Sequence, residues 1–223
     1  MHSLLNSLKA GVSQMQLGLS DDCLNRLLQY QDQLALWNTA FNLTSIRDPQ
    51  AMLVRHLLDS LSILPHLPAG RLLDIGTGGG LPGMVIAICQ PERECVLLDS
   101  NSKKIRFLRQ VTADLKVSNA KPVQVRVEDQ TAQRELGQFN VVTSRAFAAL
   151  TEFAQVGRPY LAAHGVLAAM KAVLPHDEMQ QLQADYQQQV VLLHVPNLEE
   201  ARHLIVLKPH LGTDSVCLID SIC

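Results

Sequence analysis

A glycine-rich segment that can hold a ligand occupies residues 74–83, with the sequence DIGTGGGLPG. It follows a short apolar run, residues 71–76, that is typical of a buried strand. It precedes an uncharged apolar run, residues 81–89, that predicts a helix. Glycines at such a junction let the backbone turn sharply and approach a ligand closely. Ligands of open α/β sheets bind at this edge, so we expect the segment to form a binding crevice.

Three kinds of ligand-binding loop can be compared with this segment. A phosphate-binding loop for nucleoside triphosphates needs a lysine, and none lies between Gly76 and Gly83. The dinucleotide pattern G-x-G-x-x-G is present at Gly78, Gly80 and Gly83, but this short match is weak by itself. The D-x-G-x-G-x-G pattern of S-adenosylmethionine-dependent methyltransferases is matched by Asp74, Gly76, Gly78 and Gly80.

Acidic residues at three predicted strand ends favour the methyltransferase interpretation. Asp74 would repel the pyrophosphate of a dinucleotide, whereas S-adenosylmethionine carries a positive sulfonium and a positive amine. Asp99 ends the next predicted strand and can accept hydrogen bonds from the ribose hydroxyls of either cofactor. Val127 and Glu128 close a third predicted strand, where a backbone donor and an acidic side chain can read an adenine edge. We therefore expect these acids to face a positively charged cofactor.

Strands alternate with helices through most of the chain and then give way to two adjacent strands. The predicted strands are residues 71–76, 94–99, 123–129, 139–145, 165–171, 190–195 and 202–208. The predicted helices between them are residues 81–89, 101–116, 149–162 and 176–189. Two further helices, residues 20–37 and 50–64, form a lead-in. This order predicts a doubly wound α/β fold closed by an antiparallel hairpin.

The composition excludes several classes of protein. The 223 residues carry 19 Lys and Arg against 21 Asp and Glu, a formal net charge of -2, which argues against a polybasic nucleic-acid binder. Five cysteines form no C-x-x-C pair, so neither a disulfide framework nor a zinc site is indicated. No secretion signal is evident, and the apolar run at residues 81–89 is too short for a membrane span. We expect a cytoplasmic monomer without a metal.

Several segments, taken in order, resemble one known family. These segments are WNTAFNLTSIRDPQAMLVRHLLDSL, LLDIGTGGGLPG, LLDSNSKKIRFLRQV, RVED, SRAFAAL and RHLIVLK. They are similar to the RsmG family, formerly called glucose-inhibited division protein B, over roughly residues 20–208. Its members are bacterial enzymes that methylate N7 of one guanine in 16S ribosomal RNA. The resemblance implies a Rossmann-like class I methyltransferase fold with a seven-stranded, mostly parallel sheet and an antiparallel terminal strand.

The resemblance also implies residues for the site. By position, the family's loop contacts and adenine-side pair fall on Gly76, Leu81, Val127 and Glu128. Its active-site arginine falls on Arg145, and further functional basic residues fall on Arg126 and Lys171. The expected cofactor-binding set is then Gly76, Gly78, Leu81, Asp99, Val127, Glu128 and Arg145. The expected catalytic set is Arg145, Lys171 and Arg126.

The expected chemistry needs little from the protein. Guanine N7 has a free lone pair and loses no proton on methylation, so no general base is required. Catalysis should come from alignment of N7 with the methyl group and from the exclusion of water. Arg145 can orient the base through O6, which is a hydrogen-bond acceptor of guanine. Contact of Arg145 with the cofactor or an RNA phosphate, or a structural ion pair, remains an alternative.

Other functions are compatible with the same loop. They are a methyltransferase for another RNA, a small molecule or a protein, a nicotinamide-dependent oxidoreductase, and a module that only senses S-adenosylmethionine. RNA contacts are expected from two basic clusters: Lys103, Lys104, Arg106 and Arg109, and Arg47 with Arg55. We expect a helical lead-in at residues 1–69, a methyltransferase domain at 70–209 and a tail at 210–223, together forming effectively one domain.

Overall fold

A computed structural model describes residues 3–145 and 147–210 of the chain. Seven strands form one sheet in the order β3-β2-β1-β4-β5-β7-β6. They are β1 (Leu72–Ile75), β2 (Cys95–Asp99), β3 (Ala120–Gln124), β4 (Phe139–Ser144), β5 (Leu161–Lys171), β6 (Tyr186–Leu193) and β7 (Arg202–Pro209). The first five run parallel, and β7 runs antiparallel to both of its neighbours. The predicted seven-stranded, mostly parallel fold is confirmed.

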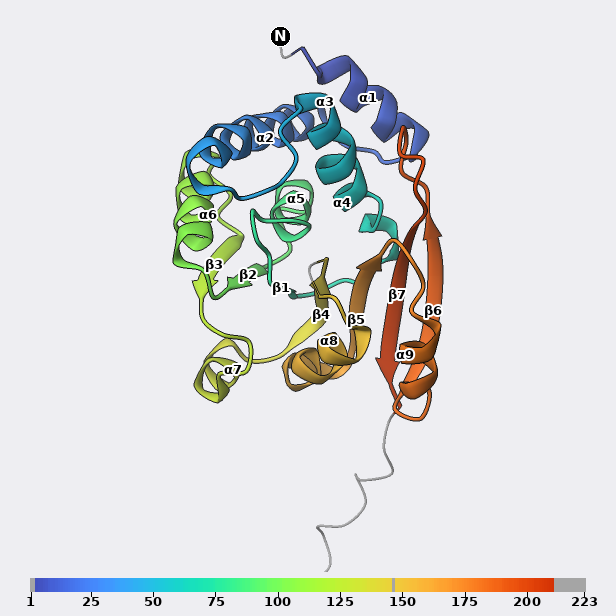
Figure 1. The fold of residues 1–223 in the computed structure, drawn as a ribbon. Coiled ribbons are helices and arrows are strands. Elements are labelled where there is room, and N and C mark those ends of the chain that lie inside the picture. The colour runs from blue at the N-terminus through green and yellow to red at the C-terminus, as the bar shows by residue number, and fades with distance from the viewer. Residues whose placement is uncertain (1–2, 146, 211–223) are drawn as a thin grey trace, which may run out of the picture.

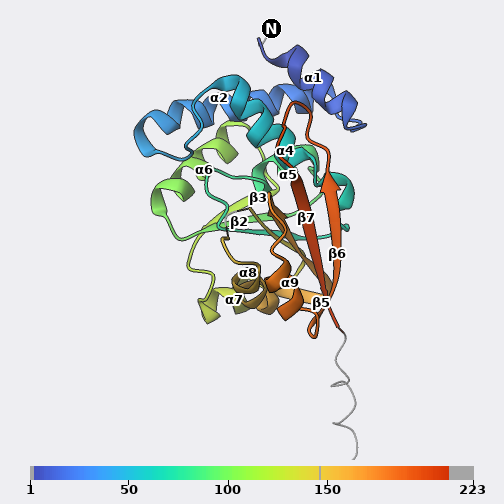
Figure 2. The same cartoon turned by 45° about the vertical axis from the view of Figure 1, so that its right-hand side comes forward.

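Helices cover both faces of this sheet (Figures 1 and 2). They are α1 (Leu5–Gln14), α2 (Asp21–Phe41), α3 (Pro49–Met52), α4 (Asp59–Leu61), α5 (Gly83–Cys89), α6 (Ser102–Asp114), α7 (Gln130–Leu136), α8 (Leu150–Gly157) and α9 (His176–Gln181). Side chains alternate along each strand: Leu72 joins the core beneath α2, α5 and α6, and Leu73 joins the core beneath α8. The sheet is therefore buried on both faces.

The N-terminal helices pack directly on the α/β core. Ser20 caps α2 by accepting a hydrogen bond from the Cys23 amide at 3.2 Å. Asp48 caps α3 by accepting from the Ala51 amide at 2.7 Å. From α3 the chain continues through a π-helical turn, Leu53–Leu58, into α4. Both predicted lead-in helices are confirmed, although the π turn was not predicted; the boundary at residue 69 stays a prediction.

Several predicted elements are wrong in their extent; the predicted helix 149–162, for example, ends at Gly157, and β5 begins at Leu161 and not at residue 165. Strand β3 ends at Gln124, so residues 125–129 form a loop, although the alternating valines predicted a strand to residue 129. Val127 packs in the core from this loop, which explains its apolar character without strand pairing. Strand β6 begins at Tyr186, inside the predicted helix 176–189, because its pairing with β7 outweighs the weak pattern of the glutamines. Helices α1 and α7 were not predicted, and the tail beyond His210 lies outside the described residues.

A buried carboxylate ties β1 to the glycine loop and to α5. Asp74 has no exposed surface, and its Oδ2 accepts hydrogen bonds from Thr77 Oγ1 at 2.6 Å and from the Gly83 amide at 2.8 Å. Burial raises the pKa of Asp74 to about 7. The expectation that this carboxylate faces the cofactor is wrong, because it lies beneath the loop and holds it in place.

Replacement of Gly83 with alanine should strongly destabilise the fold. An added Cβ would lie 2.4 Å from Leu97 Cδ2 and 2.7 Å from Asp74 Oδ2, and neither can move without disturbing the sheet. We expect Gly83→Ala to lower the free energy of unfolding in urea by about 1–3 kcal/mol. Gly18→Ala is the control, since nothing lies within 4 Å of its added Cβ. Equal stability of the two variants would contradict this packing.

Replacement of Asp74 with asparagine should remove a pH dependence of stability. The pKa of Asp74 is raised in the folded state, so its stabilising effect is complete below about pH 4 and is lost as the pH rises through about 7. Relative to Asp74→Asn, the wild-type free energy of unfolding should fall over this window, by at most about 1.4 kcal/mol per pH unit. Parallel curves for the two proteins in urea titrations between pH 4 and 8 would refute this account.

Candidate functional site

A cavity of about 230 Å³ opens where β1 and β2 end and the loop after β3 begins. Its lining comprises Ile75, Gly76, Leu98, Asp99, Ser100, Val125, Arg126, Val127, Glu128 and Phe147. A shallower hollow of about 770 Å³ continues along the same loop, past Arg126 and Glu128. Four residues that were predicted to bind the cofactor thus lie together: Gly76, Asp99, Val127 and Glu128. We call this cavity the crevice.

Asp99 is fixed against the glycine loop. Its Oδ2 accepts from the Gly78 amide at 3.0 Å and lies 3.3 Å from Lys104 Nζ. Its Oδ1 accepts from the Asn101 amide at 2.9 Å. Gly78 has a φ of +60°, a backbone conformation that favours glycine. The carboxylate therefore has a set orientation at the crevice, and Oδ1, which accepts one hydrogen bond, has a second lone pair for a hydroxyl donor.

The loop at residues 125–129 forms the opposite wall. Its ends are held by hydrogen bonds from the Val125 amide to the Asp99 carbonyl at 3.3 Å and from the Asp129 amide to the Arg126 carbonyl at 3.1 Å. Glu128 is exposed at the mouth of the crevice, and Val127 is buried. Arg126 lies in this loop and not on a strand as predicted, and it lines the crevice apart from Arg145.

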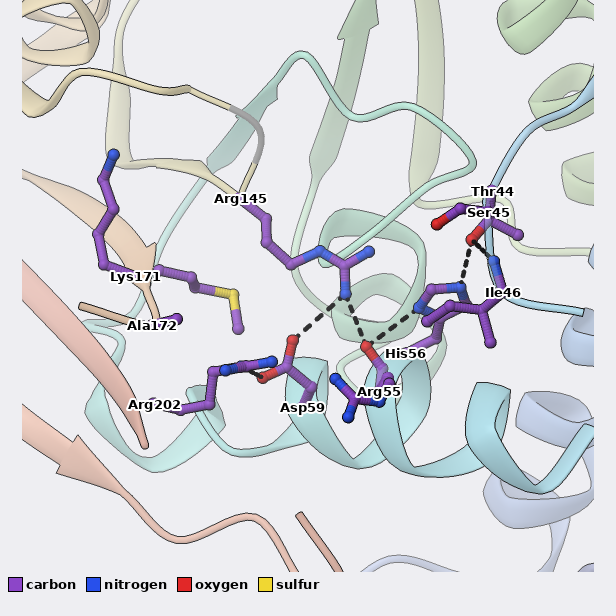
Figure 3. Close-up of a pocket in the computed structure, with 11 residues that line it drawn as sticks. Thr44, Ser45, Ile46, Arg55, His56, Asp59, Arg145, Lys171, Ala172 and Arg202 are labelled. Carbon is purple, nitrogen blue, oxygen red and sulfur yellow. Dashed lines mark hydrogen bonds and ion pairs between the residues drawn. The ribbon is translucent and has the colours of Figure 1, made fainter. Parts of the chain in front are cut away.

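A second cavity, of about 460 Å³, lies beyond the end of β4 (Figure 3). We call it the arginine pocket. It is lined by Thr44, Ser45, Ile46, Arg55, His56, Asp59, Arg145, Met170, Lys171, Ala172 and Arg202. Arg145 and Lys171, both predicted to be catalytic, line this pocket and are absent from the lining of the crevice. Half of its lining comes from the N-terminal helical segment.

A buried carboxylate organises the arginine pocket. The Asp59 side chain is 4% exposed and lies between two guanidinium groups: its Oδ2 is 3.3 Å from Arg145 Nη1, and its Oδ1 is 3.2 Å from Arg202 Nε (Figure 3). Burial raises the pKa of Asp59, and the two arginine charges oppose this rise. Arg145 Nη1 also donates to the Arg55 carbonyl at 3.0 Å, so its position depends on the helix that carries Asp59.

His56 completes the support of Arg145. Its Nδ1 lies 3.0 Å from the same Arg55 carbonyl, and its Nε2 lies 2.8 Å from Thr44 Oγ1. Burial and the nearby Arg145 charge lower the pKa of His56 to about 4, so the ring is neutral at pH 7. Because a carbonyl only accepts, Nδ1 carries the proton and Nε2 accepts from the threonine hydroxyl. Arg55 and His56 lie in the π-helical turn, a feature often found at functional sites.

The loop after β4 separates the two cavities. Arg145 lines the arginine pocket, and Phe147 lines the crevice. Lys171 Nζ donates to the carbonyls of Phe147 and Ala148, both at 2.7 Å, and its side chain extends away from Asp59 (Figure 3). Burial lowers the pKa of Lys171, and the Glu178 charge partly offsets this. The structure therefore gives Lys171 a role in holding this loop.

Some residues of the two cavities agree with the sequence analysis and others do not. Leu81 is buried in the core and lines neither cavity, although it was predicted to contact the cofactor. Asp59 and Arg202 were not predicted. Ionisable residues at positions 55, 56 and 59 of a leucine-rich helix were an available signal for Asp59, since such a helix rarely buries a charge without a partner.

The described residues support neither a metal centre nor a membrane span. In residues 3–145 and 147–210, no three His, Cys, Asp or Glu side chains gather closely enough to hold a metal ion. No helix in these ranges is long and apolar enough to cross a membrane. The crevice combines an open glycine loop with the acceptor oxygens of Asp99 and Glu128, which suit a small organic cofactor.

Relatives with high sequence identity cover nearly the whole chain. The ribosomal RNA small subunit methyltransferase G of Acinetobacter baumannii is 60% identical over 208 residues, which are 93% of this chain and 99% of that protein. The protein of the same name from Psychrobacter cryohalolentis is 48% identical over 206 residues, which are 92% of this chain and 84% of that protein.

Solved methyltransferase structures share the fold at low sequence identity. A predicted O-methyltransferase from Agrobacterium tumefaciens matches with a TM-score of 0.55 at 18% identity, over 69% of this chain and 80% of that one. TrmN from Thermus thermophilus matches with a TM-score of 0.55 at 15% identity, over 71% of this chain and 53% of that one. At such identities the likeness establishes the Rossmann-like architecture alone.

A model of the family rRNA small subunit methyltransferase G, or GidB, matches residues 23–205. This range contains the glycine loop, both cavities and all seven strands except the end of β7. The chain is therefore a methyltransferase that uses S-adenosylmethionine, and the alternative of a nicotinamide-dependent oxidoreductase is wrong. By this match and by its identity to the curated relatives, the chain belongs to the rRNA small subunit methyltransferase G family.

Proposed function

We propose that this protein transfers the methyl group of S-adenosylmethionine to N7 of one guanine in 16S ribosomal RNA of the small ribosomal subunit. The observation that carries the proposal is the pair of cavities on either side of the loop after β4. One has a glycine loop and acidic walls, which suit a cofactor that is positive at sulfur and amine. The other presents three arginines and a lysine, which suit an RNA nucleotide.

The crevice residues bind and orient the cofactor. S-adenosylmethionine supplies an activated methyl group when bound. Asp99 accepts from its ribose hydroxyls, with an orientation set by the Gly78 amide. Val127 and Glu128 contact the adenine through the amide of the peptide that joins them and through the Glu128 carboxylate. Gly76 leaves the wall of the crevice open to the cofactor because it carries no Cβ.

The arginine pocket orients the target base. Guanine N7 is already a nucleophile, so the pocket has no proton to remove, and the neutral, buried His56 is not needed as a base. Arg145 stays 27% exposed despite its ion pair, so its guanidinium can donate to guanine O6. Asp59 and the Arg55 carbonyl hold that guanidinium in one orientation before RNA arrives. This is catalysis by alignment.

RNA binding depends on local basic patches. On α6, Lys103, Arg106 and Arg109 are exposed, whereas Lys104 is paired with Asp99. Arg55 is paired with Glu200 at 2.5 Å and is a weaker candidate for a phosphate. A base in folded RNA must leave its stack to enter the pocket. We propose that a cytoplasmic monomer acts on the ribosomal subunit or an assembly intermediate, with residues 1–69 and 70–209 as parts of one domain.

Methyl transfer to isolated small subunits tests the proposed function. Subunits that lack the modification are incubated with the protein and labelled S-adenosylmethionine, and the modified nucleotide is identified by mass spectrometry. We expect one N7-methylguanine per 16S ribosomal RNA, and weaker labelling of the free RNA. Labelled cofactor bound to the protein without label in the RNA would favour the alternatives of another substrate or a sensing module.

Loss of Arg145 should abolish transfer while cofactor binding remains. We expect Arg145→Ala to lower the rate of methylation by about 100-fold or more, because the base loses its orienting donor. Arg202 still pairs with Asp59 in this variant, and thermal unfolding checks that it folds. Arg158→Ala is the control, as Arg158 lines neither cavity. Full activity of Arg145→Ala would refute this role.

Loss of the Asp99 charge should weaken cofactor binding. We expect Asp99→Asn to raise the Kd for S-adenosylmethionine by about 10-fold or more, since hydrogen bonds to a charged acceptor are lost or weakened. Asp114→Asn is the matched control, because Asp114 is an exposed carboxylate on α6 that accepts from Gln110. The measurement is calorimetry without RNA. Equal affinities of the two variants would show that Asp99 does not bind the cofactor.

A further inference from the structure

The chain has three tyrosines, and two of them brace the walls of the crevice from behind. Tyr30 donates to the Gly79 carbonyl at 2.7 Å, and Tyr160 donates to the Val127 carbonyl at 2.9 Å. Both side chains are fully buried. The third tyrosine, Tyr186, lies 3.5 Å from the Ala154 carbonyl in α8, away from the crevice. The two short bonds thus end on the glycine loop and on the loop after β3.

Tyr30 reaches the glycine loop from α2. The hydroxyl lies against the loop so closely that a Cβ added to Gly80 would be 3.2 Å from it. Burial raises the pKa of Tyr30 well above its ordinary value, so the hydroxyl keeps its proton and remains a donor. Gly78 and Gly80, on either side of the anchored carbonyl, have φ values of +60° and +102°. Because glycines have wide conformational freedom, a hydrogen bond from outside the loop helps to fix the loop in one conformation.

Tyr160 reaches the loop after β3 from the other face of the sheet. It ends a short 3₁₀ turn, Arg158–Tyr160, directly before β5. Burial raises its pKa to about 12, so it too is a donor at neutral pH. The Val127 carbonyl also accepts from Gln133 Nε2, but at the longer distance of 3.3 Å. Tyr160 is therefore the closer anchor of this peptide.

The anchored carbonyl at Val127 has a consequence for the amide that follows it. In a trans peptide the carbonyl and the next N–H point in opposite directions. The Val127 carbonyl points to the buried Tyr160 hydroxyl, so the Glu128 amide points away from Tyr160, and both residues line the crevice. An amide in this position can donate to a ring nitrogen of adenine. The tyrosine hydroxyl thereby sets the direction of a donor that it does not touch.

We propose that Tyr30 and Tyr160 are positioning residues for S-adenosylmethionine: Tyr30 fixes the glycine loop, and Tyr160 fixes the adenine-contacting peptide of Val127 and Glu128. Neither touches the cofactor. This inference rests on the proposed function only in that the crevice is the cofactor site. It goes beyond that proposal, because it makes cofactor affinity depend on the N-terminal helix α2 and on the turn before β5.

The test replaces each tyrosine with phenylalanine, which removes one hydroxyl and keeps the ring. Affinity is measured by calorimetry with S-adenosylhomocysteine, which cannot react, and with adenosine. We expect Tyr30→Phe and Tyr160→Phe to weaken binding of S-adenosylhomocysteine by about 3–10-fold. Tyr160→Phe should weaken adenosine to the same extent, whereas Tyr30→Phe should affect adenosine less. Tyr186→Phe is the matched control and should bind both ligands within about two-fold of wild type.

Kinetics separate positioning from a loss of fold. In both variants the KM for S-adenosylmethionine should rise while kcat at saturating cofactor stays near the wild-type value. Unchanged affinity in Tyr30→Phe and Tyr160→Phe would overturn the proposal, and so would equal losses in all three variants that follow their thermal unfolding. The binding assay contains no RNA, so a wild type that binds S-adenosylhomocysteine but methylates no ribosomal RNA would refute the proposed substrate and leave this inference standing. A wild type that binds neither ligand would overturn both.

Discussion

The reversal of strand order at β1 is the constraint on which both cavities depend. β1 pairs with β2 on one side and β4 on the other. The connection after β1 therefore leads to one half of the sheet, and the connection after β4 leads to the other. The space between them at the carboxyl edge cannot be closed by either half. The glycine loop, Asp99 and the loop after β4 all lie at this edge, because each directly follows one of these strands or ends it. The residues that line the cavities lie at this edge because the topology leaves it open.

The N-terminal helices are part of the site and not an appendage to it. They supply Asp59 and His56 to the arginine pocket and Tyr30 to the glycine loop. Asp59 is held by Arg145 and Arg202 from the core, and a buried carboxylate without such partners would be costly. The ion pairs therefore give docking of this segment a specific geometry, while its leucines supply the apolar contact area. Six of the eleven residues that line the arginine pocket belong to this segment, so removal of the segment would remove the pocket.

The sequence predicted most of the fold because its signals are local. Apolar runs and glycines identified the strands and the crevice, and the acids at strand ends identified Asp99 and Glu128. The failures are of another kind. Asp74 was predicted to face the cofactor because it lies at the end of a strand beside the glycine loop. A residue at such a position can either face the crevice or lie beneath the loop, and only the 0% exposure of Asp74 shows that it lies beneath. Asp59 and Arg202 are 143 residues apart, and no periodicity reports a pair formed by packing. The alternating pattern around Val127 predicted a strand where the structure has a loop. The polar run around Tyr186 predicted a helix where the structure has the start of β6.

The charge balance has a different meaning once the acids are located. A formal net charge of -2 counts every carboxylate equally. Asp59 and Asp99, however, are buried and paired with cations. Asp74 is buried, with a pKa of about 7. None of the three therefore places an exposed, unpaired negative charge on the surface of the protein. The cations Lys103, Arg106 and Arg109 of α6 are exposed. Attraction of RNA is then local to one edge of the sheet, and the long-range field stays weak. In the proposed function, such a surface attracts random RNA weakly, and specificity depends on the RNA shape and the base that fit the arginine pocket.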